Sequence, residues 1–126
     1  MKRFVGLDLH KRSAVFCIID LGGKVLARGE VAVSRESIEA FARGWLQSED
    51  ELVLEATTNT WAVVDLLRPY VARVAIANPL RVRAIAEARV KTDKIDAHIL
   101  AQLLRNDFLP EVWVPDSATR SLRERR

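Results

Sequence analysis

The sequence has little cysteine and no long hydrophobic run. Cys17 is the only cysteine among 126 residues, which excludes a disulfide framework or a thiolate zinc site and indicates a reducing, cytoplasmic compartment. No stretch approaches the roughly 18 apolar residues that cross a bilayer, so an integral membrane protein is excluded. Asp8 and the basic residues after it interrupt any signal-peptide core. The hydrophobic fraction of 49% excludes a disordered chain and predicts one globular domain.

The charge is unevenly distributed along the chain. Lys and Arg number 20 against 17 Asp and Glu, for a formal net charge of +3. Residues 1–80 hold ten basic and ten acidic side chains, whereas residues 81–126 hold ten and seven, so the excess lies in the second segment. A basic end is compatible with a polyanionic partner, although many surface helices have the same composition.

The hydrophobic pattern predicts a sheet flanked by helices. Five segments alternate or are rich in β-branched residues, as strands are: 4–9, 14–20, 24–33, 51–56 and 74–77. Apolar residues at helical spacing predict four helices. The first follows the N-cap residue Ser34, the second contains Trp61 to Leu67, and the third covers about 80–88. The fourth covers 93–105, with Thr92 as its predicted cap. The tryptophans Trp45 and Trp61 fall on apolar helix faces, which predicts core positions.

The order of these elements indicates a fold class. Three strands with short connections form an antiparallel meander, and helical crossovers then add parallel strands with right-handed connections. We therefore expect a ribonuclease-H-like α/β fold with a mixed five-stranded sheet, an arrangement shared with actin-like ATPases. The fold alone does not decide the function.

Acidic side chains lie at the ends of two predicted strands. Asp8 lies in the first strand, where burial of a carboxylate is costly unless a cation or several donors compensate it. Glu55 ends the fourth strand. If these strands are parallel neighbours, both acids lie at adjacent carboxyl ends, where open α/β sheets bind ligands. The alternative for each is a solvated acid without a role.

Two further acids precede or begin the last predicted helix. Asp93 and Asp96 are three residues apart, so they share a helix face, and Asp96 continues the apolar stripe toward the sheet. An acid in a first turn is also favoured by the helix dipole alone. Four carboxylates without Cys or paired His match Mg²⁺ or Mn²⁺ rather than zinc. Two such ions can stabilise the attacking and leaving oxygens of a phosphodiester displacement.

Several basic side chains are candidates for phosphate contacts. His10 and Lys11 follow Asp8 directly and either contact phosphate or lie in a loop. Arg83, Lys91 and Lys94 belong to a basic cluster that is suitable for backbone phosphates, although a solvated helix face is nearly as good an interpretation. Trp113 lies between prolines, so a base stack or a partner contact is open.

Four motifs together resemble a known family, the DEDD transposases of the Piv-invertase type, which form the insertion sequence one-ten family. In chain order they are Phe4-Val5-Gly6-Leu7-Asp8-Leu9-His10-Lys11, then Leu54-Glu55-Ala56-Thr57, then Asn78-Pro79 with Val82-Arg83, and finally Lys91-Thr92-Asp93-Lys94-Ile95-Asp96-Ala97. The last motif is quite specific, and four in this order are strong. The resemblance covers residues 3 to about 116.

The resemblance implies a RuvC-like catalytic domain over 1–106, in which Asp8, Glu55, Asp93 and Asp96 are the DEDD acids around Mg²⁺. Residues 107–126 would then be an extended, proline-containing exit and the truncated start of a connecting helix. Family members also carry a C-terminal domain with a catalytic serine, assemble as multimers and act on DNA, some with a structured guide RNA. The expected activity is DNA strand cleavage and transfer, for which this chain alone is expected to be incomplete.

Three other functions remain open from the residues. A sugar-kinase-like ATPase begins similarly, but it would need glycines and hydroxyls after Asp8, where this chain has His10, Lys11 and Arg12. A Holliday-junction resolvase shares the fold and the four acids. The third alternative is a nucleic-acid-binding remnant that does not cleave.

Overall fold

The computed structural model describes residues 1–57, 60–91 and 95–112. Its sheet order is β3-β2-β1-β4-β5-β6. The strands β1 (Arg3–Leu9), β2 (Ser13–Asp20) and β3 (Val25–Ala32) form the predicted antiparallel meander. Next to β1 lie β4 (Glu51–Glu55) and then β5 (Arg73–Ala77), both parallel to it, which confirms the predicted crossovers.

The prediction of five strands misses a sixth. The short strand β6 (Glu111–Val112) pairs antiparallel with β5, where Val112 lies opposite Ile76. The carbonyl of Pro110 also accepts a hydrogen bond from the Asn78 N–H at 2.9 Å. Two residues between prolines have no periodicity to detect, so only the pairing identifies them as a strand.

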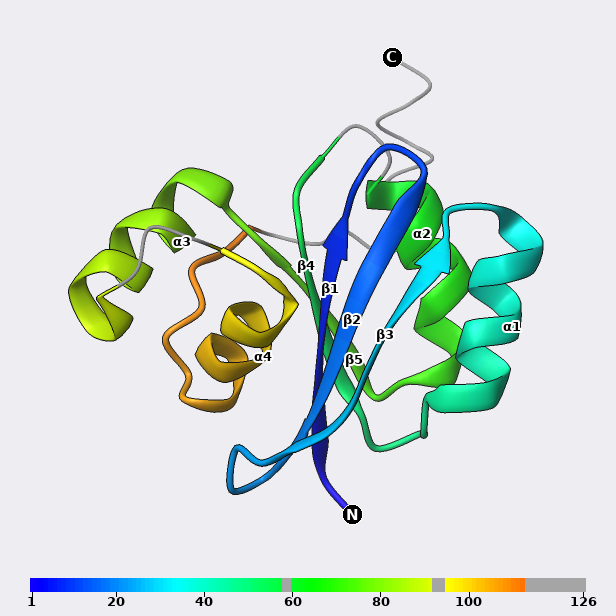
Figure 1. The fold of residues 1–126 in the computed structure, drawn as a ribbon, viewed down its shortest axis with the longest axis horizontal. Coiled ribbons are helices and arrows are strands. Elements are labelled where there is room, and N and C mark those ends of the chain that lie inside the picture. The colour runs from blue at the N-terminus through cyan, green and yellow to red at the C-terminus, as the bar shows by residue number, and fades with distance from the viewer. Residues whose placement is uncertain (58–59, 92–94, 113–126) are drawn as a thin grey trace.

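Helices cover both faces of the sheet (Figure 1). On one face lie α1 (Arg35–Trp45), α2 (Thr60–Leu67) and the 3-10 turn η1 (Arg68–Tyr70). On the other lie α3 (Pro79–Ile85), which continues as the π-helical segment η2 (Ala86–Val90), and α4 (Ala97–Arg105). This is the ribonuclease-H-like and actin-like arrangement. In the described part of the chain, no helix is long and apolar enough to span a bilayer.

Strand alternation divides the core into two layers. In β1, Val5 and Leu7 are fully buried against the α1 and α2 side, whereas Phe4 packs in the cluster that contains Leu100 and Leu103 of α4. Both faces of the sheet are therefore covered by helices. Since side chains alternate along β1, the position of a polar residue in the strand decides which of the two faces its side chain lies on.

A buried ion pair fixes the start of β1. Arg3 donates to both carboxylate oxygens of Asp50, at 2.9 and 2.7 Å, and also to the carbonyl of Trp45 at 2.7 Å. Asp50 is fully buried and also accepts a hydrogen bond from the Gln47 N–H at 2.8 Å. The bidentate geometry compensates the desolvation of both charges and ties β1 to the connection between α1 and β4.

The predicted helix cap holds for α1, whereas α4 is capped by Asp96, and the predicted cap Thr92 lies outside the described residues. Ser34 accepts from the Ser37 N–H at 3.2 Å and caps α1, as predicted. The two tryptophans predicted as core residues are instead partly exposed, Trp45 by 48% and Trp61 by 37%. Trp45 is the last residue of α1 and its ring still packs against Phe16 of β2, whereas Trp61 lies in the first turn of α2. Trp113 lies outside the described residues.

Candidate active site

Asp8 and Glu55 lie side by side at the carboxyl ends of two parallel strands. β1 and β4 pair in the register Leu7 opposite Leu54, so the next residues, Asp8 and Glu55, are adjacent. Leu7 and Leu54 are buried on the α1 and α2 side, and alternation directs both acids to the α4 side. Both acids are partly buried. The structure therefore brings together the two strand-end acids singled out in the sequence.

Local hydrogen bonds hold the end of β4. The Thr60 hydroxyl donates to the Glu55 carbonyl at 3.0 Å and accepts from the Thr57 N–H at 2.6 Å. The Ala56 N–H donates to the Ala77 carbonyl at 3.0 Å, which extends the pairing with β5 past Glu55. Since Thr60 is buried, these bonds are protected from water and fix the backbone that carries Glu55.

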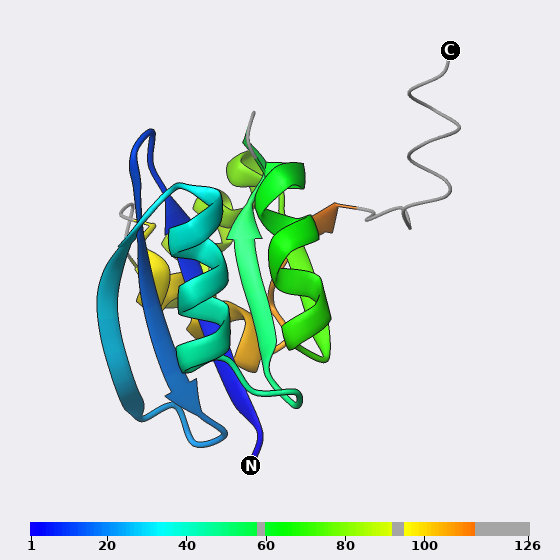
Figure 2. The same ribbon diagram turned by 90° about the vertical axis from the view of Figure 1, so that its right-hand side faces the viewer.

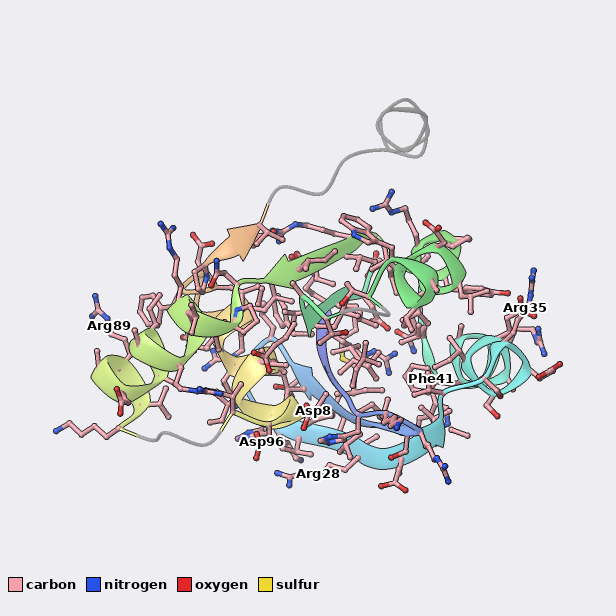
Figure 3. The ribbon with its side chains drawn as sticks, turned by 90° about the horizontal axis from the view of Figure 1, so that it is seen from above. Asp8, Arg28, Arg35, Phe41, Arg89 and Asp96 are labelled. Carbon is pink, nitrogen blue, oxygen red and sulfur yellow. The ribbon has the colours of Figure 1, made fainter. Side chains whose placement is uncertain are left out.

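Asp96 reaches the same region from a helix terminus. It is the N-cap of α4 in an extended conformation (φ −128°, ψ −179°), and its Oδ1 accepts from the Ile99 N–H at 2.9 Å. The predicted helix start at Asp93 is therefore wrong within the described residues, because Ile95 and Asp96 are not helical. An Asp that caps cannot also lie inside the first turn. Figure 3 shows Asp96 and Asp8 on the same side of the sheet.

The close approach of α4 to β1 depends on a glycine. A Cβ built on Gly6 would lie 1.8 Å from the carbonyl oxygen of Ala97 and 3.0 Å from the Ala101 nitrogen. Gly6 comes two residues before Asp8, and Ala97 comes directly after Asp96. The absent side chain therefore allows the strand and the helix terminus to bring these two acids near one another.

The pKa values of Asp8 and Glu55 are both raised, in part because acids lie close to one another. Burial raises the pKa of Asp8; the His10 charge opposes the rise and the negative charge of Asp96 adds to it. Burial likewise raises the pKa of Glu55, and the Asp8 charge adds to that rise while Arg83 opposes it. Each carboxylate is therefore destabilised by desolvation and by a neighbouring acid, the condition that a bound cation relieves.

The His10 side chain contacts Asp8, so it is more than a loop residue without contact to the acids. Its Nε2 is 3.2 Å from Oδ2 of Asp8, and its side chain is 57% exposed. The His10 N–H donates to the Ser13 carbonyl at 2.8 Å, which closes the turn between β1 and β2. The histidine is thus both a turn residue and a hydrogen-bonding partner of Asp8.

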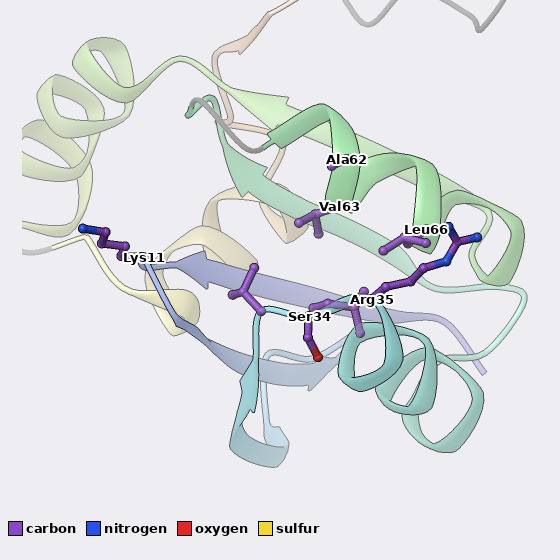
Figure 4. Close-up of a pocket in the computed structure, with 8 residues that line it drawn as sticks. Lys11, Ser34, Arg35, Ala62, Val63 and Leu66 are labelled. Carbon is purple, nitrogen blue, oxygen red and sulfur yellow. The ribbon is translucent and has the colours of Figure 1, made fainter.

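The predicted basic residues separate into two groups. Arg83 on α3 is exposed and lies on the α4 side of the sheet with the acids. Its positive charge favours the ionised form of Glu55 and so opposes the rise in the pKa of Glu55. Lys91 is exposed and ends η2 in the left-handed conformation (φ 60°, ψ 45°). Lys11 instead contributes to a hollow of about 430 Å³ on the α1 and α2 side, with Ser34 and Leu66 (Figure 4). No predicted acid lines that hollow.

One charged residue near the acids has no signal in the sequence. Arg28 on β3 lies opposite Cys17 of β2. Burial raises the pKa of the Cys17 thiol; Arg28 opposes that rise and Asp96 adds to it, so both charged groups are near the thiol. The position of Arg28 follows from the pairing of β2 with β3, which sequence spacing does not give.

The donor chemistry fits a hard divalent cation. Asp8, Glu55 and Asp96 offer only carboxylate oxygens, which Mg²⁺ and Mn²⁺ prefer. Over residues 1–57, 60–91 and 95–112, no group of three or more His, Cys, Asp or Glu side chains is arranged to hold a metal ion. Asp93 and Lys94 lie outside the described residues. The described acids therefore converge without forming a complete coordination shell.

Comparison with known proteins identifies the family. Residues 5–125 match the family DEDD_Tnp_IS110, described as transposase. The chain belongs to the IS110 family of DEDD transposases. This confirms the family predicted from the four motifs, whose members cleave and transfer DNA strands and typically use a divalent metal.

A sequence relative of this IS110-family chain is a longer protein. "Putative transposase y4qE" of Sinorhizobium fredii (strain NBRC 101917 / NGR234) is 29% identical over 125 residues, which are 96% of this chain and 32% of that protein. The chain thus spans about a third of the length of this relative.

Among solved structures, RuvC of T. thermophilus with a Holliday-junction substrate matches with 9% identity and a TM-score of 0.44, covering 89% of this chain and all of that one. The polyphosphate/ATP-glucomannokinase of Arthrobacter sp. strain KM matches with 21% identity and a TM-score of 0.45, covering 75% and 51%. The strand order itself defines the fold of this IS110-family chain.

Proposed function

We propose that this chain is the metal-dependent DNA-cleavage domain of an IS110-family transposase. The observation that supports the proposal most is the convergence of Asp8, Glu55 and Asp96 on the α4 side of the sheet, from two strand ends and one helix cap. Asp93, three residues before the cap, is proposed as the fourth acid. Residues 1–106 are proposed as the catalytic domain and residues 107–126 as the connection to a further part.

The four acids would hold Mg²⁺ or Mn²⁺. A bound ion of this type polarises a phosphodiester and lowers the pKa of an attacking hydroxyl or water. The protein's own groups prepare the site: Gly6 lets α4 approach β1, and the hydrogen bonds around Thr60 fix the Glu55 backbone. His10 hydrogen-bonds Asp8 and restricts the orientation of its carboxylate.

Basic residues around the acids would hold the nucleic acid. Arg83 is the best supported, because it is exposed and its charge acts on Glu55. His10, Lys91 and Lys94 are proposed as further phosphate contacts; Lys94 lies outside the described residues. Lys11 is proposed as a contact for a backbone that crosses from the acids to the hollow beside Ser34 (Figure 4).

Strand transfer by the whole protein would need more than these residues. We propose that a further domain supplies a serine nucleophile and that a structured RNA guides target choice, as the family resemblance implies. The matched relative is about three times as long as this chain, which leaves room for such a domain in proteins of this kind. A cytoplasmic, multimeric DNA-binding enzyme is the corresponding proposal for the full protein.

The proposal is tested on the 126-residue chain by gel-shift and nicking assays with linear DNA, branched DNA and structured RNA, each with and without Mg²⁺ or Mn²⁺. We expect binding to DNA that tightens with the metal, and loss of this tightening in Asp8→Asn and Glu55→Gln. Glu87→Gln, which removes one acidic charge from the exposed surface of η2 and leaves Asp8 and Glu55 in place, is the matched control. Cleavage of branched DNA by the chain alone would favour a resolvase-like nuclease. Equal binding with and without metal would favour a non-catalytic remnant and contradict the proposal.

A further inference from the structure

The strand β3 forms one edge of the sheet. It is the first strand in the sheet order, pairs with β2 on one side, and has no neighbour on its other side among the described strands. Figure 2 shows no described element beyond β3 at this edge, while α1 covers only one face. An edge strand presents a row of outward N–H and C=O groups that can pair with another strand.

The ladder with β2 determines which residues of β3 point outward. The Val33 N–H donates to the Arg12 carbonyl at 2.9 Å, so this pair is hydrogen-bonded. Hydrogen-bonded and non-hydrogen-bonded pairs alternate in antiparallel ladders. Val31 and Gly29 therefore direct their backbone groups to β2, whereas Arg28, Glu30 and Ala32 direct theirs away from it.

The charges on this edge favour one self-pairing register, the only one that places Arg28 opposite Glu30. In an antiparallel pairing of β3 with the β3 of a second copy, the outward residues must face one another. A two-fold axis at Arg28 or at Glu30 would place like charges directly opposite, which is destabilising. An axis at Gly29 places Arg28 of each copy opposite Glu30 of the other. Both side chains are exposed and lie on the same face of the strand, so both pairs can form.

We propose that two copies of this chain associate through their β3 edges, antiparallel and centred on Gly29. The pairing joins the two sheets into one continuous sheet. It requires no function of the acids, so it stands independently of the proposed DNA cleavage. It also has a spatial consequence: a two-fold axis perpendicular to the sheet leaves Asp8 of both copies on the same face, where one nucleic acid could contact both sites.

A hollow with both polar and apolar lining, Glu30 and Ser37 among it, lies beside the same edge. A cavity of about 410 Å³ is lined by Val31 and Ala32 of β3 and by Phe41, Gly44 and Trp45 of α1. The Trp45 ring lies 5.3 Å from that of Phe16 and is 48% exposed. A second copy seated at β3 lies next to this hollow and removes apolar surface from water, which adds to the pairing of the strands.

Charge exchange across the edge tests the proposal. Sedimentation equilibrium of the 126-residue chain over a concentration series should show a monomer–dimer equilibrium. Arg28→Glu and Glu30→Arg should each raise the dimer dissociation constant at least about tenfold, because each places two like-charge pairs at the axis. An equimolar mixture of the two variants should recover dimers at wild-type concentrations, because every pair across the mixed dimer then joins opposite charges.

The controls keep the charge changes but move them off the edge. Arg81→Glu and Glu87→Arg alter exposed residues of α3 and η2 by the same charge, and neither should change the dissociation constant more than about twofold. Circular dichroism melting of the single variants checks that they fold. The proposal is overturned if the wild type stays monomeric at the highest soluble concentration. It is equally overturned if the mixture dimerises no better than the variants alone.

Discussion

Gly6 of β1 touches the carbonyl oxygen of Ala97 at the start of α4, leaving no space for a side chain at Gly6. This contact lies between the strand that carries Asp8 and the helix capped by Asp96. It makes the spacing of the two acids a consequence of backbone packing rather than of side-chain chemistry.

Gly6→Ala should destabilise the protein by about 1–3 kcal/mol, because the new methyl group forces α4 away from β1. The free energy of unfolding in urea measures this effect. Gly44→Ala is the matched control: nothing lies within 4 Å of its added Cβ, and it lies inside α1. It should stabilise by about 0.5–1 kcal/mol. A Gly6→Ala protein as stable as the wild type would contradict the close packing.

Asp8→Asn and Glu55→Gln should stabilise the metal-free protein at neutral pH. The pKa values of both acids are raised on folding, so the native state prefers their protonated forms. That preference stabilises the protein below the unfolded-state pKa of about 4 and is lost as the pH rises through the raised values. Thermal melts in EDTA at pH 7 should therefore give both variants a higher melting temperature than the wild type.

At acid pH the difference between these variants and the wild type should disappear. Glu87→Gln, on the exposed surface of η2, is the control and should melt like the wild type at both pH values. If Asp8→Asn were less stable than the wild type at pH 7 without metal, the ionised Asp8 carboxylate would stabilise the folded protein, which would contradict this prediction.

Asp96 should have two separable roles. Asn caps helices as well as Asp does, so Asp96→Asn should change the unfolding free energy by less than about 0.5 kcal/mol. Asp96→Ala removes the acceptor of the Ile99 N–H and should cost about 1 kcal/mol. Both should weaken Mn²⁺ binding to the same extent in a calorimetric titration. Mn²⁺ affinity retained in Asp96→Asn would mean that this residue is a cap and nothing more.

Arg83→Ala should weaken DNA binding to all sequences alike. A phosphate contact releases about one counterion, so the slope of log K against log salt should fall by about one. Fluorescence anisotropy at several salt concentrations measures that slope. Arg68→Ala, on the α1 and α2 side, should leave it unchanged. Equal slopes for the two variants would exclude a phosphate contact at Arg83.

Much of the fold follows from local patterns in the sequence. The five longer strands and the Ser34 cap agree with the structure to within one or two residues, because alternation and capping are local signals. The adjacency of Asp8 and Glu55 could also be predicted, since strand parity and parallel crossovers define both the face and the edge where the strands end.

The features that escaped prediction depend on tertiary contacts. The start of α4 was misplaced because helical spacing cannot distinguish an acid in the first turn from an acid that caps. Arg28 reaches the neighbourhood of Cys17 through the register of β2 and β3, and β6 is recognisable only by its partner β5. Trp45 fits an apolar stripe, yet it is the last residue of α1, and 48% of it stays exposed although its ring packs against Phe16 of β2.

The most direct test of the metal-dependent site is a Mn²⁺ titration of the 126-residue chain, followed by calorimetry and by the electron paramagnetic resonance of free Mn²⁺. The wild type should bind the ion saturably, and Asp8→Asn and Glu55→Gln should each lose at least about tenfold in affinity, because each removes a charged oxygen ligand. Glu87→Gln should bind as the wild type does. Equal Mn²⁺ affinity in the wild type and in both acid variants would contradict the account.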